Sequence, residues 1–162
     1  MEELKTTKQL NIMTYKIPLF DLNFGKEEEE AVIETLRSKW ISTGPKCEEL
    51  ENLFCDSIGT QHALTTASCT AALHLAVLAV GIQAEDEVIV PSLTFSATVN
   101  VVKYAGAIPV FADVKSYEDL TIDPADIEKK ITSKTKAIIP MHYGGFACDM
   151  DKIMEIARKY NL

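Results

Sequence analysis

From about residue 62 onward, short apolar runs alternate with longer segments whose apolar residues recur at helical spacing. The apolar runs are rich in β-branched residues and predict strands at 62–66, 87–90, 108–114 and 135–141. The segments between and after them predict helices at 70–80, 96–104, 124–131 and 149–160. Strands and helices alternating at this spacing indicate βαβ units, with a mostly parallel sheet covered on both faces.

Two amphipathic helices are predicted ahead of this alternation. In the first, which starts at Lys26, the apolar residues share one face: Val32, Ile33, Leu36 and Trp40. Its first turn carries a run of glutamates, which the helix dipole favours, so the run is interpreted as a solvated helix start. After the turn "STGP" at 42–45, a second stripe is ended by Gly59: Leu50, Leu53, Phe54 and Ile58.

Composition and charge narrow the class of protein. The chain has 162 residues, 47% of them hydrophobic, which is enough for a globular domain with its own core. A net charge of −8 argues against nucleic acid or an anionic membrane as a partner, because both would be repelled. The N-terminus lacks the pattern of a secretory signal, and the longest apolar stretch, 71–82, is shorter than the roughly 20 residues of a membrane span. We therefore expect a cytoplasmic location.

A metal site has no support in the sequence. The cysteines lack the paired spacing of zinc ligands and the histidines are scattered, so the thiols are interpreted as reduced and structural. Residues 1–25 are interpreted as an N-terminal arm, since residues 1–16 are polar and aperiodic.

Three stretches follow predicted strands, at the edge where ligands of open α/β sheets bind: "ASCTA" (67–71), "PSLTF" (91–95) and "HYGG" (142–145). Ser68 and Thr70 lie at a helix start, where they either cap the helix or hold a phosphate. Phe95 either stacks on a flat ligand or belongs to the core. His142 and Tyr143 either line the rim of a site or are structural. No G-x-G-x-x-G or Walker A pattern is present, so the usual nucleotide sites are excluded.

Four stretches together change this picture: "STGPKCEELENLF", "SCTAALHLAVLAVGIQAEDEVIVPSLTFSATVNVVKYAGAIPVFADV", "TIDPADIEKKITSKTKAIIPMHYGG" and "DMDKI". In this order and spacing they closely resemble the N-terminal half of the DegT/StrS-type sugar aminotransferases, over about residues 17–162. The resemblance implies an α/β fold of three αβα layers with a mostly parallel sheet, like the large domain of the aspartate aminotransferase (type I) fold, here truncated. Residues 26–162 would form the N-terminal part of that domain, and the cofactor would be pyridoxal 5′-phosphate.

The resemblance also assigns residues to the cofactor. Thr70 and Ala71 would bind its phosphate through the hydroxyl and main-chain N–H groups, with Ser68 beside them, and Phe95 would stack on its pyridine ring. Thr43 and Gly44 match a loop that would contact the substrate or a second subunit. Relatives often carry glycine or alanine where this chain has Cys69, so a larger side chain stands beside the phosphate; it could be accommodated if it points into the core.

The catalytic residues of the family fall outside this sequence. The lysine that anchors the cofactor covalently and the carboxylate that pairs with the pyridine nitrogen lie downstream of "IARKYNL", and the sequence stops at Leu162. None of the lysines present is a good substitute, so the catalytic set within the chain is empty and the segment alone is expected to be inactive.

Three hypotheses follow. The first is a homodimeric aminotransferase that aminates a nucleotide-linked keto-sugar, with glutamate as the amino donor, for polysaccharide or amino-sugar biosynthesis. The second is a sugar dehydratase on the same fold, in which the anchoring lysine is replaced. The third is a short non-catalytic chain that binds phosphate or pairs with a complete homologue.

Overall fold

The computed structural model describes residues 21–162, and the chain divides into two compact units, Met1–Ala63 and Leu64–Leu162. Each unit is described by itself. The N-terminal arm predicted for residues 1–25 lies outside the described residues except for its last five, so it stays a prediction.

The first unit contains two helices, α1 (Lys26–Ser38) and α2 (Pro45–Ile58). Both were predicted, and Gly59 ends α2 in the left-handed conformation (φ 75°), as expected for a glycine after a helix. Trp40 was predicted on the apolar face of α1, and this is wrong. Lys39 adopts a left-handed conformation (φ 63°) that ends the helix, so Trp40 belongs to the following turn. Neither helix has a buried residue.

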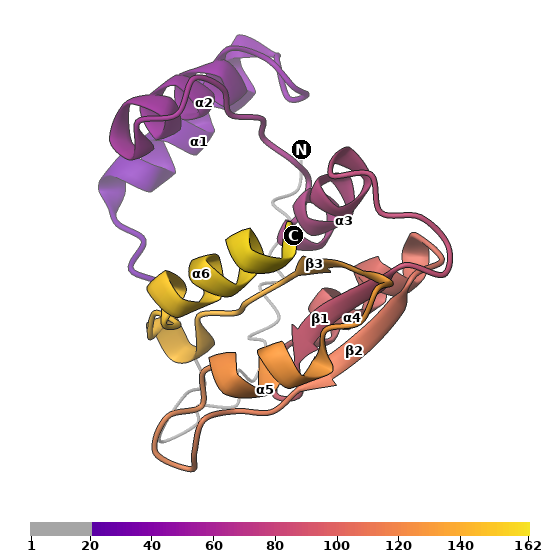
Figure 1. The fold of residues 1–162 in the computed structure, drawn as a ribbon. Coiled ribbons are helices and arrows are strands. Elements are labelled where there is room, and N and C mark those ends of the chain that lie inside the picture. Colours follow the sequence, from indigo (N-terminus) through magenta and orange to yellow (C-terminus); the bar gives the residue numbers. More distant parts are fainter. Residues whose placement is uncertain (1–20) are drawn as a thin grey trace, which may run out of the picture. The chain divides into compact units, whose positions relative to one another are not determined.

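The second unit is built on a parallel sheet of three strands within the described residues, in the order β2-β1-β3 (Figure 1). The strands are β1 (Glu87–Pro91), β2 (Ile108–Ala112) and β3 (Thr135–Ile138). β1 lies in the centre and pairs in parallel with both neighbours, from Glu87↔Ile108 to Pro91↔Ala112 on the β2 side. The parallel sheet predicted from the sequence is confirmed.

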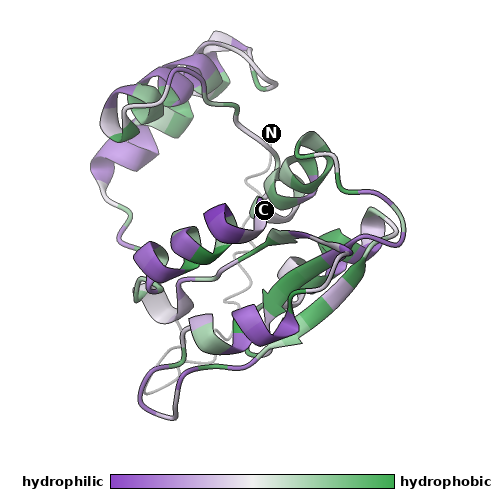
Figure 2. Cartoon of the chain, in the orientation of Figure 1, coloured by the Kyte–Doolittle hydropathy of each residue, from purple (hydrophilic) through white to green (hydrophobic). Residues whose placement is uncertain are grey.

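Helices cover both faces of this sheet. One core contains the β1 side chains Val88 and Val90 together with residues of α3 (Cys69–Ala79) and α4 (Ser96–Tyr104). The other contains Ile89 together with residues of α5 (Pro124–Lys130) and α6 (Met150–Tyr160). Because successive strand residues point to opposite faces, the apolar run at residues 88–90 of β1 serves both cores, and β1 is hydrophobic over most of its length in Figure 2. The three-layer αβα architecture is confirmed.

One predicted strand is absent from the described residues. Residues 62–66 run without regular structure into α3, and Leu64 is 76% exposed. A strand needs a neighbour for its N–H and C=O groups, and none of the described strands pairs with this segment. The strand predicted here from local composition is therefore not formed within residues 21–162. Among the described helices, none is long and apolar enough to cross a membrane.

Candidate functional site

The start of α3 forms a group of polar donors. Ser68 is the N-cap residue, with extended backbone, and its Oγ accepts a hydrogen bond of 3.2 Å from the N–H of Ala71. The N–H groups of Cys69 and Thr70 precede the first bonds of the helix, and no described residue accepts from them. Such N–H groups at the positive end of a helix dipole suit an anion.

The capping role of Ser68 is therefore present in the structure, whereas phosphate binding by Ser68, Thr70 and Ala71 stays a prediction. The two roles compete at one point, because the N–H of Ala71 already donates to Ser68. A phosphate held by Ala71 would replace the Ser68 hydroxyl as its acceptor. Cys69 is exposed, so its side chain does not enter the core and stands at the surface of this helix start.

The loop after β1 presents an aromatic ring. Phe95 precedes α4 as its N-cap residue and is 71% exposed, so in this unit its ring is not part of the core. The loop is fixed by its neighbour Thr94, whose hydroxyl lies 2.9 Å from that of Thr98 and 3.2 Å from the Met141 sulfur. An exposed ring on a fixed loop is suited to stacking on a flat ligand.

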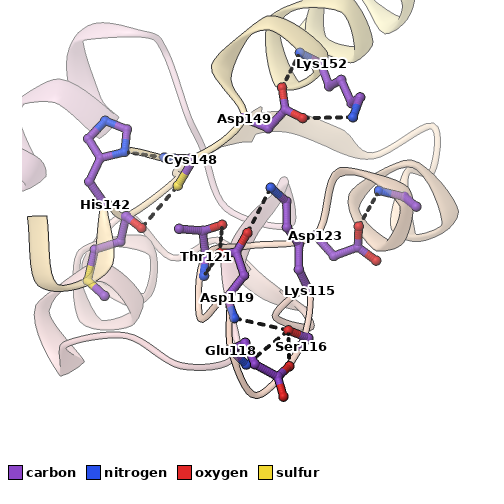
Figure 3. Close-up of polar contacts among 12 residues, drawn as sticks. Lys115, Ser116, Glu118, Asp119, Thr121, Asp123, His142, Cys148, Asp149 and Lys152 are labelled. Carbon is purple, nitrogen blue, oxygen red and sulfur yellow. Dashed lines mark hydrogen bonds and ion pairs between the residues drawn. The ribbon is translucent and has the colours of Figure 1, made fainter. Parts of the chain in front are cut away.

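The loop after β3 lies beside the Phe95 loop, because Met141 contacts Thr94. It contains His142 and the short 3-10 turn η1 (Tyr143–Gly145), and it ends at the buried Cys148. The main-chain N–H of Cys148 donates to Nδ1 of His142 at 3.1 Å (Figure 3). The sequence identified His142 as a candidate for the rim but gave no sign of its link to Cys148, six residues further on.

Charged side chains also fix the start of α6 and the loop after β2 (Figure 3). Asp149 caps α6 by accepting from the N–H of Lys152, and it pairs with the Lys152 ammonium at 2.9 Å. The hydrogen bond from Lys152 lowers the pKa of Asp149 from its ordinary value. A hydrogen bond from the Thr121 side chain likewise lowers the pKa of Asp119, which also pairs with Lys115. Because these charged groups pair with one another, we assign them a structural role and not a role in ligand binding.

The turn predicted to contact substrate or a second subunit belongs to the first unit. The Trp40 indole N–H donates to the carbonyl oxygen of Thr43 at 2.9 Å, and the ring lies against Gly44. Gly44 is the N-cap residue of α2, and Pro45 follows at the first helical position. The conformation of this turn is thus held by Trp40, while its role in binding stays a prediction.

The second unit is therefore an open α/β domain in which two main-chain N–H groups at the start of α3 have no described partner and the ring of Phe95 is exposed. These features fit pyridoxal 5′-phosphate: the N–H groups of Cys69 and Thr70 suit its phosphate, and Phe95 suits its ring. The chain belongs to the DegT/DnrJ/EryC1/StrS aminotransferase family, whose sequence model matches residues 23–162.

Known proteins of similar sequence and structure support this family assignment. The chain is 46% identical over 155 residues to the spore coat polysaccharide biosynthesis protein SpsC of Bacillus subtilis, a match that covers 96% of this chain and 39% of SpsC. It superposes with a TM-score of 0.83 and 36% identity on the putative sugar aminotransferase Spr1654 from Streptococcus pneumoniae, in its PMP-form, covering 90% of this chain and 36% of that one. For S. venezuelae DesV the TM-score is 0.79, with 38% identity and coverage of 84% and 36%.

These comparisons confirm the family and the fold predicted from the sequence. The structures of Spr1654 in PLP-form and PMP-form agree with the predicted cofactor. The chain spans 39% of the length of SpsC and 36% of that of Spr1654.

Proposed function

We propose that this chain is the N-terminal part of the cofactor-binding domain of a pyridoxal-phosphate-dependent aminotransferase that aminates a nucleotide-linked keto-sugar. The observation that carries the proposal is the start of α3 in a member of this family, where two main-chain N–H groups without a described partner lie beside the Thr70 hydroxyl. Spr1654 is described as a putative sugar aminotransferase, which supports a sugar as the substrate.

Within this proposed function, the residues of this chain bind the cofactor and orient its ring. Thr70, with the N–H groups of the first turn, holds the phosphate, and Ser68 releases the N–H of Ala71 to it. Phe95 covers one face of the pyridine ring and excludes water from it. When bound, the cofactor supplies an electron sink for the carbon that exchanges its amino group. The lysine that anchors the cofactor is expected beyond Leu162.

The remaining parts of the proposal follow the family pattern. Glutamate is the amino donor, and the product enters polysaccharide or amino-sugar biosynthesis, as the description of SpsC suggests for that relative. The working enzyme is a cytoplasmic homodimer, and the turn with Thr43 and Gly44 contacts the substrate or the second subunit.

The phosphate site can be tested without turnover. The probe is 4-deoxypyridoxine 5′-phosphate, which carries the ring and the phosphate but no aldehyde, so it cannot react with lysines. We expect binding to the wild-type chain in calorimetric titrations. Replacing Thr70 by Ala removes a hydrogen bond to a charged group, which should weaken binding by about 1–2 kcal/mol.

Thr35→Ala is the matched control, because Thr35 is a half-buried helical threonine of the first unit whose hydroxyl donates to the Ala31 carbonyl of its own helix. It should leave the affinity unchanged. Unchanged affinity in Thr70→Ala would show that Thr70 does not bind the phosphate and is an ordinary residue of the first helical turn. Absence of binding to the wild-type chain would contradict the cofactor site itself. The amination reaction is tested separately, in the natural gene product, with glutamate and a nucleotide-linked keto-sugar.

A further inference from the structure

His142 is held in a defined orientation by Cys148. The main-chain N–H of Cys148 donates to His142 Nδ1 at 3.1 Å, and its thiol donates to the carbonyl of the preceding residue, Met141, at 3.2 Å. Cys148 is only 5% exposed, and it directly precedes the N-cap residue of α6. One buried residue thus fixes both the backbone and the ring of His142.

This contact determines which ring nitrogen can donate. Because Nδ1 accepts a hydrogen bond, the neutral imidazole carries its proton on Nε2. Figure 3 shows this second nitrogen directed away from Cys148, and no described residue bonds to it. The His142 side chain is exposed. His142 thus keeps an oriented donor at the surface.

The donor lies at the same edge of the sheet as Phe95. The pairing of β1 and β3 continues past β3 through the N–H of Ile139, which donates to Ile89 at 2.8 Å, so both strands run to one edge. Beyond that edge, the hydroxyl of Thr94 donates to the Met141 sulfur at 3.2 Å. The residues next to Phe95 and His142 are therefore in direct contact.

We propose that His142 is a ligand-binding residue, whose Nε2–H donates to an acceptor oxygen on the edge of the ring that Phe95 stacks on. The proposal rests on the proposed function, because it takes that ring to be the pyridine of the cofactor, which carries a phenolic oxygen. Cys148 acts as a positioning residue that sets the tautomer.

Two substitutions separate ligand binding by His142 from a purely structural role. Asparagine at position 142 places an acceptor near the Nδ1 position, so it can keep the hydrogen bond from Cys148, but it has nothing at the Nε2 position. Glutamine places an N–H donor near the Nε2 position and does not reproduce the Nδ1 acceptor. The asparagine variant therefore retains the acceptor of the histidine, and the glutamine variant retains its donor.

The test measures the affinity of the wild-type chain, His142→Asn and His142→Gln for 4-deoxypyridoxine 5′-phosphate. We expect His142→Asn to bind about tenfold more weakly, the effect of losing one hydrogen bond to a charged acceptor, and His142→Gln to stay within about threefold of the wild type. Inorganic phosphate, which engages only the start of α3, should bind all three proteins equally and shows that the variants are folded.

Other results overturn the assignment. If His142→Gln loses affinity while His142→Asn keeps it, His142 has a structural role and does not bind the ligand. If both variants bind like the wild type, or both lose affinity to the same extent, Nε2 makes no specific contact. If the wild-type chain binds phosphate but not the pyridine probe, both proposals fail together. Loss of affinity in Thr70→Ala without loss in His142→Asn leaves the proposed function intact and rejects this inference alone.

Discussion

The indole N–H of Trp40 donates to the carbonyl oxygen of Thr43 at 2.9 Å, so the ring folds back over the turn that leads into α2. The ring occupies the space that a side chain at Gly44 would need, because a Cβ there would overlap the indole nitrogen of Trp40. Because the backbone at Gly44 is extended, glycine is needed here for space and not for a left-handed conformation. The shape of the "STGP" turn thus depends on Trp40 and Gly44 together.

Replacing Gly44 by Ala should displace the Trp40 ring and break its hydrogen bond to Thr43. The chain has one tryptophan, so selectively excited tryptophan fluorescence reports on this ring, while its near-ultraviolet circular dichroism band is read against the signals of the tyrosines and phenylalanines. We expect a red-shifted emission maximum and a weaker near-ultraviolet signal, because the ring becomes more mobile and more hydrated.

Gly25→Ala is the control for this prediction. Gly25 is also an N-cap glycine, but a Cβ there would meet only the Glu28 carboxylate, at an ordinary 3.5 Å. Its spectrum should match the wild type. A Gly44→Ala spectrum identical to the wild type would contradict the packing of Trp40 against Gly44.

Replacing Asp149 by Asn should reduce stability at neutral pH and have little effect in acid. The pKa of Asp149 is lowered, chiefly by its hydrogen bond from Lys152, so the contribution of the carboxylate is complete above its unfolded pKa of about 4. It is lost as the pH falls through the lowered folded value. Urea unfolding from pH 7 to pH 2 should therefore show the stability gap between wild type and variant closing below about pH 4.

Asparagine also caps helices well, so this substitution removes mainly the charge. Asp151→Asn is the matched control, because it removes the same charge from the same helical turn, and Asp151 forms no ion pair with any described residue. A gap for Asp149→Asn that persists unchanged to pH 2 would assign its effect to capping and not to ionisation.

Replacing Glu85 by Gly should stabilise the second unit. Glu85 is an exposed loop residue between α3 and β1 with a left-handed backbone (φ 70°), which costs a side-chain-bearing residue about 1–2 kcal/mol. Part of this gain is offset because glycine makes the unfolded chain more flexible. We expect a net increase of about 0.5–1 kcal/mol in the free energy of unfolding.

Glu85→Ala removes the same charge but keeps the Cβ atom, so it should give no such increase. Equal stabilisation by alanine and glycine in urea titrations would show that the charge of Glu85, and not its backbone conformation, was unfavourable.

Local sequence predicted most of the elements correctly, because helices and their ends depend on near neighbours. The helix at 96–104 has the predicted bounds. Asp123 caps α5 as expected, since its carboxylate accepts from the N–H of Ala125 at 3.0 Å and Pro124 opens the helix. Ser68 lies at the predicted helix start.

The candidate site was only partly predictable. Thr70 and Phe95 are candidates because they stand next to predicted element boundaries, where ligands of α/β folds bind, and their roles in binding stay predictions. The link between His142 and Cys148 could not be found in this way. It depends on a loop that turns back through Gly144 and Gly145, both with positive φ, and no local pattern specifies that the ring of one residue meets the N–H of another.

The sequence by itself predicted most of the elements in their order, several of the helix ends and the family, because periodicity, caps and aligned motifs are local or linear properties. Only the tertiary structure decided that residues 62–66 form no strand, since strand formation requires a partner that composition does not supply. The tertiary structure also decided that Trp40 packs against the turn at Thr43 and that Nε2 of His142 is left free to donate. Both depend on contacts between residues that the folded backbone brings together.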